Sequence, residues 1–158
     1  MKIILYEERY APDFARLNRE WLEGFGLLEE ADEKHLNSPR ESIIDNGGQI
    51  FFAVEGKAVL GTCAAIRHCS EVVEIAKLAV AHSEQRQGIG RLLIKRVIDY
   101  ARSIGARKVS LVSSTRLRSA LRLYESMGFA HASMPTNPGY ASADVYMELV
   151  LSGAATVD

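Results

Sequence analysis

One stretch, from Val73 to Leu93, constrains the fold of this chain more than any other. It begins as a mostly apolar strand, passes through a short polar connection, and reaches a loop that contains Gly88 and Gly90. After Gly90, apolar side chains recur at helical spacing, and Gly105 stands where that helix is expected to end. The stretch therefore predicts a strand, a glycine turn and an amphipathic helix in direct succession.

A glycine turn that leads into a helix N-terminus presents unpaired backbone N–H groups to one point in space. The helix dipole adds partial positive charge there, which suits a phosphate or pyrophosphate group. Two familiar phosphate motifs fail on spacing. The nucleotide-hydrolase loop needs Gly-Lys-Ser/Thr, but Arg91 and Leu92 follow Gly90. The dinucleotide fingerprint needs a third glycine at position 93, which is Leu93.

What remains is a Gln-x-x-Gly-x-Gly pattern at Gln85, Gly88 and Gly90. It resembles the Gln/Arg-x-x-Gly-x-Gly/Ala motif of the GNAT superfamily of acetyl-CoA-dependent N-acetyltransferases. The flanking segments resemble the same family. Glu74–Val80 precedes the loop, and Ala120–Phe129 resembles the family's Leu-Tyr-x-x-x-Gly-Phe signature.

The order of the expected elements, β-α-α-β-β-β-α-β-α-β-β, also matches that family. The resemblance is strongest over residues 47–150 and implies an α/β (α+β) fold, the GNAT fold, with a mixed, mostly antiparallel central sheet and helices on both faces. It further implies that the strand ending near Ala81 and the strand starting near Lys108 splay apart to accept the pantetheine arm of acetyl-CoA. The expected strands are 2–6, 49–54, 57–66, 72–81, 109–112, 129–134 and 144–151, and the expected helices are 11–23, 39–45, 88–104 and 117–127. A capping box at Ser38–Glu41 is expected to open the second helix.

The chain has 158 residues, 47% of them hydrophobic, which is enough for one domain and too little for two. We expect a single N-acetyltransferase domain over 1–151 and a loose tail over 152–158. No apolar run reaches membrane-spanning length, and two cysteines cannot form a disulfide framework. No His/Cys cluster has zinc spacing, so no metal is expected. These features favour a soluble, cytoplasmic protein.

The net charge of −1 hides an uneven distribution of charge. Basic side chains stand at positions 86, 91, 95, 96, 102, 107, 108, 116, 118 and 122, and Asp99 alone opposes them within that segment. The segment that holds the glycine loop should therefore attract a polyanionic cofactor. A pI of about 6.4 and the lack of interleaved aromatic residues argue against nucleic-acid binding. A homodimer remains possible because dimers are common in the family.

The resemblance assigns cofactor contacts to specific positions. Backbone N–H groups near Leu78–Val80 are the family's usual oxyanion donors, and those of residues 87–91 are expected at the phosphates. Ser119 stands where many relatives place a longer asparagine against the pantetheine, so that contact is in question. The expected cofactor-binding residues are Leu78, Ala79, Val80, Gln85, Arg86, Gln87, Gly88, Ile89, Gly90, Arg91, Ser119 and Tyr124.

Acetyl transfer to an amine needs a neutral amine, although a free lysine-like amine has a pKa of about 10.4. Glu74 begins the strand that leads to the glycine loop, where the family often places a catalytic glutamate. The resemblance implies that Glu74 is a general base, acting directly or through water. The alternative is a strand-end carboxylate that pairs with a cation such as Lys77, and both remain open.

The departing thiolate also needs stabilisation. Tyr124 matches the family tyrosine that faces the cofactor sulfur, and the alternative is a core tyrosine on an apolar helix face. His82 lies near the loop and is a further candidate for a ligand or base, although a surface or loop position is the simpler explanation. Trp21 and Tyr140 could line an acceptor pocket, although helix packing and loop anchoring are simpler explanations.

The expected function is acetyl transfer from acetyl-CoA to a primary amine of a small molecule or peptide, by direct attack in a ternary complex. The alternative is a catalytically silent acyl-CoA-binding or sensor domain of the same fold. The sequence does not identify the acceptor. An acidic run over residues 20–35 predicts a cationic acceptor, and an ordinary solvated acidic surface explains the same run.

Overall fold

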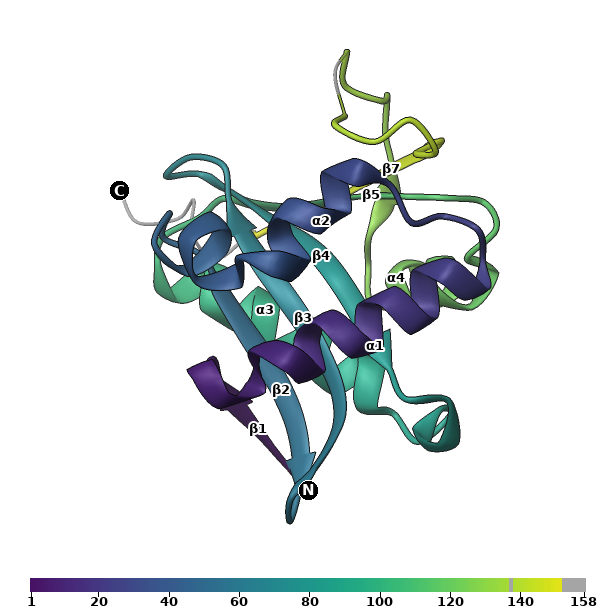
Figure 1. Cartoon of the computed structure of the whole chain (residues 1–158). Coiled ribbons are helices and arrows are strands. Elements are labelled where there is room, and N and C mark those ends of the chain that lie inside the picture. Colours follow the sequence, from purple (N-terminus) through teal and green to yellow (C-terminus); the bar gives the residue numbers. More distant parts are fainter. Residues whose placement is uncertain (137, 152–158) are drawn as a thin grey trace.

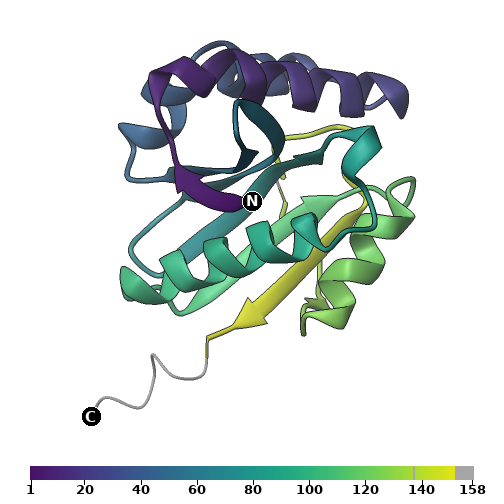
Figure 2. The ribbon, with the colours of Figure 1, turned by 90° about the horizontal axis from the view of Figure 1, so that it is seen from below.

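The framework of the protein is one seven-stranded sheet with the strand order β1-β2-β3-β4-β5-β7-β6. The structure, a computed structural model, describes residues 1–136 and 138–151. Helices α1 and α2 cross one face of the sheet, and α3 and α4 cover the other (Figures 1 and 2). The strands are β1 (Lys2–Leu5), β2 (Gln49–Glu55), β3 (Ala58–Arg67), β4 (Val72–Val80), β5 (Lys108–Ser113), β6 (Ala130–His131) and β7 (Val145–Val150). The helices are α1 (Ala11–Gly24), α2 (Glu30–Asn37), α3 (Ile89–Ser103) and α4 (Arg118–Ser126).

Most neighbouring strands run antiparallel, and β4 with β5 is the one parallel pair among the described strands. The expected mixed, mostly antiparallel sheet with helices on both faces is confirmed. Each face has its own apolar core. Leu93 and Val97 of α3 are fully buried on one side, and Phe14 of α1 with Phe52 of β2 is fully buried on the other.

The expected splay lies between β4 and β5. These strands pair only where Val72–Glu74 faces Lys108–Ser110. Beyond that point β4 continues beside β3 as far as Val80, and β5 continues beside β7 as far as Ser113. The two strands therefore separate, and a gap opens toward the glycine loop.

A β-bulge interrupts β4 at the same level. Lys77 and Leu78 both lie opposite Cys63 of β3, and Lys77 has a left-handed φ of 56°. Because side chains alternate along a strand, a regular β4 would place Lys77 on the face of the buried residues Val73 and Ile75. The bulge turns Lys77 toward α1 and α2 instead, and bulges commonly re-aim a side chain in this way.

The structure corrects the sequence prediction at the second helix. Helix α2 spans residues for which no helix was predicted, and its capping box is formed by Glu29 and Asp32. Ser38 ends α2 rather than starting the next helix, so the predicted capping box with Glu41 is absent. A short π-helical turn, Arg40–Ile44, follows. The acidic first turn of α2 complements the helix dipole, which favours this arrangement.

The predicted strand over 129–134 is also shorter, because only Ala130 and His131 pair with β7. The expected loose tail over 152–158 lies outside the described residues. Among the residues that are described, no helix combines the length and apolar character needed to cross a bilayer.

Candidate active site

A cavity of about 340 Å³ runs along the glycine loop and the start of α3. Ala79 does not line this cavity because it is buried in β4, and Gln87 is exposed on the loop. Tyr124 belongs to the neighbouring cavity described below. The sequence-predicted cofactor residues that line the first cavity are Leu78, Val80, Gln85, Arg86, Gly88, Ile89, Gly90, Arg91 and Ser119.

The backbone at the loop leaves donors for a ligand. Gly88 has a φ of 79° and caps α3 without a side-chain hydrogen bond, and Arg86 has a φ of 67°. The N–H of Leu92 donates to the carbonyl of Gly88 at 3.1 Å. The N–H groups of residues 89–91 precede this bond and have no carbonyl partner within the helix. This arrangement can hold an anionic group at the positive end of the dipole.

Gly90 lies where α3 approaches α4. A Cβ atom at this position would stand 3.2 Å from Cδ2 of Leu123. Arg91 reaches the same helix, because its guanidinium donates to Oγ of Ser126 at 2.9 Å. The side chain of Arg91 is therefore tied to the end of α4, while Arg86 is exposed on the loop.

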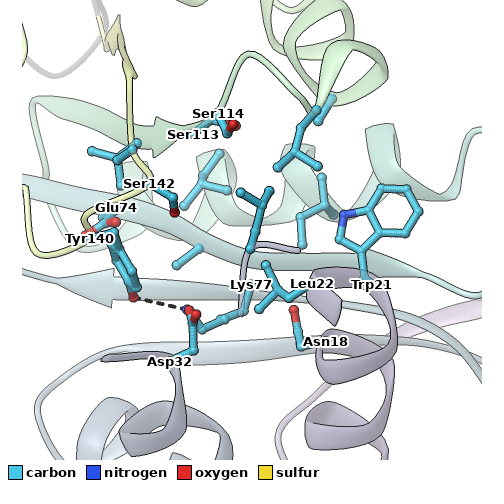
Figure 3. A pocket seen from close by; sticks show the side chains of 18 of the residues that line it. Asn18, Trp21, Leu22, Asp32, Glu74, Lys77, Ser113, Ser114, Tyr140 and Ser142 are labelled. Carbon is cyan, nitrogen blue, oxygen red and sulfur yellow. Dashed lines mark hydrogen bonds and ion pairs between the residues drawn. The ribbon is translucent and has the colours of Figure 1, made fainter. Parts of the chain in front are cut away.

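A second cavity, of about 120 Å³, lies between α1, α2, the bulge of β4 and the segment before β7 (Figure 3). It shares Trp21, Leu78 and Ala120 with the first cavity, so the two meet at these residues. The two expected catalytic residues, Glu74 and Tyr124, both line it. The other polar residues of its lining are Asn18, Asp32, Lys77, Ser113, Ser114, Tyr140 and Ser142.

Glu74 has 13% of its side chain exposed and contacts a histidine. Its Oε1 lies 2.5 Å from Nε2 of His68, which follows β3. The hydrogen bond with Glu74 raises the pKa of His68 above its usual value. Lys77, the example of a cation that the alternative explanation paired with Glu74, lies elsewhere, because the bulge turns it toward α2.

Lys77 forms an ion pair with Asp32 that is almost fully shielded from solvent. Its ammonium donates to Oδ1 of Asp32 at 2.5 Å and to the hydroxyl of Tyr140 at 3.0 Å (Figure 3). Burial opposes the charge of Lys77, but the attraction of Tyr140 and Asp32 prevails and raises the pKa of Lys77. The other carboxylate oxygen of Asp32 accepts the N–H of Glu29 at 2.8 Å.

Glu29 fastens the segment before β7 to the start of α2. Its carboxylate accepts the N–H groups of Ala141 and Ser142, each at 2.9 Å, and the hydroxyl of Ser142. The bond from Ser142 lowers the pKa of Glu29. One wall of the second cavity is thus held by charged groups whose chain segments lie far apart in the sequence.

Tyr124 is 6% exposed and packs its ring against Phe129, with the centroids 5.8 Å apart. Burial raises the pKa of Tyr124, so its hydroxyl stays protonated over the ordinary pH range. The tyrosine is both part of the core and open to the second cavity.

His82, Trp21 and Tyr140, the other candidates from the sequence, lie around the two cavities. His82 lies 3.7 Å from the carboxylate of Glu20 and stacks beside Trp21, at a centroid distance of 5.7 Å. Trp21 lines both cavities, and Tyr140 lines the second. The described part of the chain contains no cluster of three or more His, Cys, Asp or Glu side chains arranged to hold a metal.

Sequence reasoning missed several residues of the second cavity, among them Asn18 and Asp32. Asn18 carries a signal that could have revealed it, because it falls on the apolar stripe of α1, four residues after Phe14 and four before Leu22. Asp32 belongs to the acidic run over residues 20–35. Its approach to Lys77 depends on the bulge of β4, which strand periodicity does not reveal.

A glycine loop at a helix N-terminus, beside splayed strands that open on a second polar cavity, is the architecture of an acyltransferase. Residues 11–129 match the model of the acetyltransferase (GNAT) family. The match covers most of the chain, and the chain belongs to this family.

Sequence relatives are described as N-acetyltransferases. The chain is 29% identical over 148 residues to C1271.07c of Schizosaccharomyces pombe, described as an uncharacterized N-acetyltransferase, and this covers 89% of the chain and 88% of that protein. It is 28% identical over 97 residues to the Bacillus subtilis N-acetyltransferase YvbK. The second match covers 60% of the chain and 63% of YvbK, less than two thirds of that relative.

Solved structures support the fold. A GNAT-family acetyltransferase from Staphylococcus aureus superposes with a TM-score of 0.87 at 20% identity, covering 95% of the chain and 98% of that structure. The acetyltransferase yncA of Salmonella typhimurium, solved with its cofactor acetyl-CoA, gives a TM-score of 0.78 at 20% identity, covering 99% and 97%. At this identity the two structures support the fold alone.

Proposed function

We propose that this protein transfers the acetyl group of acetyl-CoA to a primary amine of a small molecule or peptide, by direct attack in a ternary complex. The observation that carries the proposal is the meeting of the two cavities at Trp21, Leu78 and Ala120, beside the point where β4 leaves β5. A cofactor along one cavity and an amine in the other would bring their reacting ends together at this junction.

In this proposal the pyrophosphate of acetyl-CoA binds the N–H groups of residues 87–91. The pantetheine arm lies in the gap between β4 and β5, which stop pairing after Glu74. From Ile75 onward, the edge of β4 that faces this gap pairs with none of the described strands. The N–H of Ala81 donates to Leu60 of β3, so alternation turns the N–H of Ala79 to β3 as well and those of Leu78 and Val80 to the gap. The N–H groups of Leu78 and Val80 are therefore placed to donate to the thioester oxygen as negative charge develops. The acetyl-CoA bound to yncA supports this cofactor.

Glu74 is the proposed general base. The reacting amine must lose a proton, since an amine with a pKa of about 10.4 is charged at neutral pH. Glu74 lines the cavity with a partly exposed carboxylate, so it can accept that proton directly or through water. The contact with His68 orients the carboxylate and leaves one of its oxygens for the amine.

Tyr124 is the proposed donor to the leaving sulfur. A thiol has a pKa of about 8.5 and a phenol one of about 10, so proton transfer from tyrosine to a thiolate is uphill. Burial raises the pKa of Tyr124 further and makes complete transfer still less favourable. The hydroxyl therefore acts through a hydrogen bond that strengthens as charge grows on sulfur.

The size of the second cavity, about 120 Å³, favours a slender amine. The acidic run provides less attraction for a cation than its composition suggests, because many of its carboxylates have partners. Asp32 pairs with Lys77, Glu33 with Arg19, and Glu29 bonds to the segment before β7. We therefore assign acceptor choice to the lining of the cavity rather than to long-range charge.

Initial-rate kinetics test the proposed mechanism. A panel of primary amines is screened for thiol release from acetyl-CoA, and both substrates are then varied for the best acceptor. Direct attack in a ternary complex predicts intersecting double-reciprocal lines and no acetyl-enzyme on quenching. Parallel lines, or a covalently acetylated protein formed without amine, would contradict direct attack.

A further inference from the structure

Asn18 is a polar residue in an apolar setting. It is 1% exposed in the middle of α1, one turn from Phe14 on one side and one turn from Leu22 on the other. Asparagine is a poor residue for a helix interior because its side chain competes for backbone hydrogen bonds. Neither helix formation nor core packing accounts for an amide at this position.

The orientation of this amide follows from its one hydrogen bond. The Nδ2 atom of Asn18 donates to the carbonyl of Phe14 at 2.9 Å. A carbonyl oxygen can only accept, so the NH₂ group must face Phe14 and Oδ1 must point the other way. Asn18 lines the second cavity, and its oxygen is turned toward that cavity (Figure 3). No hydrogen bond to Oδ1 is found within the described residues.

The neighbouring polar groups on this side of the cavity are already engaged. One oxygen of Asp32 accepts from Lys77 and the other from the N–H of Glu29. The hydroxyl of Tyr140 accepts from Lys77. Oδ1 of Asn18 is therefore an acceptor on the helix side that is left for a bound molecule.

We propose that Oδ1 of Asn18 accepts a hydrogen bond from the reacting nitrogen of the acceptor and thereby selects primary amines over secondary amines. This inference rests on the proposed function. A neutral primary amine has two N–H groups. One proton goes to Glu74, the other N–H bonds to Asn18, and the lone pair is left to point at the thioester carbon.

The step balances with these groups. The N–C bond forms, the C–S bond breaks, and the sulfur leaves with its electron pair as a thiolate stabilised by Tyr124. Glu74 first passes the ammonium proton on to solvent, so its carboxylate is free to take one nitrogen proton during attack, and the second stays on the amide product within reach of Asn18. A neutral secondary amine has a single N–H. It cannot give a proton to Glu74 and also donate a hydrogen bond to Asn18.

The test compares wild type with Asn18→Leu, which keeps the side-chain volume and removes both polar atoms. Thiol release from acetyl-CoA is measured with primary amines, each paired with its N-methyl analogue. Wild type should prefer the primary amine. In Asn18→Leu, kcat/KM for the primary amine should fall by roughly 10- to 100-fold, the loss expected for one hydrogen bond to a bound group, while the N-methyl analogue changes little.

Asn46→Leu is the matched control. The Nδ2 atom of Asn46 makes the same kind of bond, to the carbonyl of Ser42 four residues earlier at 3.1 Å, but Asn46 is exposed and lines neither cavity. Its preference for primary amines should equal that of wild type. An unchanged preference in Asn18→Leu would overturn the inference and leave the proposed function intact. Failure of wild type to release thiol with any amine would overturn both.

A second readout does not require an acceptor. If Oδ1 serves to bind the acceptor, leucine removes an oxygen that faces the cavity and makes no hydrogen bond to the described residues, and Tm should stay level or rise. If the amide serves the fold instead, its loss should lower Tm. A lower Tm together with an unchanged amine preference would make Asn18 a structural residue.

Discussion

The ammonium of Lys77 and the carboxylate of Asp32 lie 2.5 Å apart in an ion pair that is almost closed to solvent, with the two side chains 6% and 4% exposed. The β-bulge brings Lys77 to this position at the cost of a left-handed backbone conformation, which is unusual for a residue with a side chain. Strained backbone of this kind is concentrated at functional sites. The pair joins β4 to α2 at the wall of the acceptor cavity.

Breaking this pair on one side should destabilise the fold. Lys77→Met leaves the charge of Asp32 buried without its partner, and the free energy of unfolding should fall by about 3–5 kcal/mol. The double variant Lys77→Met/Asp32→Asn should recover most of the loss, because an asparagine amide still accepts the N–H of Glu29. Urea denaturation measures both. A Lys77→Met protein as stable as wild type would show that the ion pair does not contribute to the free energy of unfolding.

Tyr124→Phe should separate catalysis from binding. The change removes one hydroxyl and keeps the buried ring, so kcat should fall by roughly ten- to a thousand-fold while affinity for acetyl-CoA and Tm stay nearly constant. Steady-state kinetics and calorimetry measure the two quantities. Tyr146→Phe is the control, because its hydroxyl bonds to Glu148 on β7 and lines neither cavity. A kcat equal to wild type would leave Tyr124 as a core residue only.

Glu74→Gln should change both the rate and its pH dependence. The amide is isosteric but cannot take a proton, so kcat/KM near pH 7 should fall by roughly 100- to 10,000-fold. The deficit should shrink at higher pH, because an amine with a pKa of about 10.4 increasingly loses its proton to solvent. A pH–rate profile of each protein tests this. If the two profiles superimposed, Glu74 would have a structural role alone.

The pair of His68 and Glu74 should make stability depend on pH. Because the pKa of His68 is raised above its usual 6.5 in the folded protein, its stabilisation is full below about pH 6.5 and is lost as pH rises through the raised value. His68→Gln removes this contribution, so the two proteins should differ most at low pH and converge above the raised pKa. Denaturation curves across this range test the sign. A difference that grows with pH would refute it.

Gly90→Val should block the cofactor loop. Its branched side chain would enter the space beside Leu123, where even a Cβ atom has only 3.2 Å, and would hinder approach to the helix N-terminus. Calorimetry should show at least about a tenfold loss of affinity for acetyl-CoA. Gly24→Val is the control, because a Cβ atom there meets no atom within 4 Å. Unchanged affinity for acetyl-CoA in a folded Gly90→Val protein would contradict the assignment of the phosphate site to this loop.

The sequence predicted the parts of the fold that local patterns determine. Apolar periodicity after Gly90 and the Gln85-x-x-Gly88 motif located α3 and its loop, and alternation from Val145 onward located β7. The splay of β4 from β5 came from the family resemblance, because strand periodicity says nothing of where two neighbours part. Helix α2 was missed since Glu29 is an uncommon capping residue and Ser38 is a common one.

The residues that line the second cavity were harder to predict from the sequence, for a related reason. The alternation rule places Lys77 beside Ile75, and only the bulge, a feature of pairing with β3, reverses this. Asp32 then meets Lys77 across a long stretch of chain, and no short-range pattern records such a contact. Asn18 was within reach of sequence reasoning, because a polar side chain on an apolar stripe is itself a signal.

Transfer of an isotopically labelled acetyl group from acetyl-CoA to an amine tests the central claim most directly. The cofactor is labelled in its acetyl group, wild type is incubated with the best primary amine, and the products are separated by mass. The label should appear in the amide of the acceptor, in step with thiol release, and Tyr124→Phe should slow both equally. Label released as free acetate, or an acceptor without label while thiol accumulates, would contradict transfer to an amine at the junction of the two cavities.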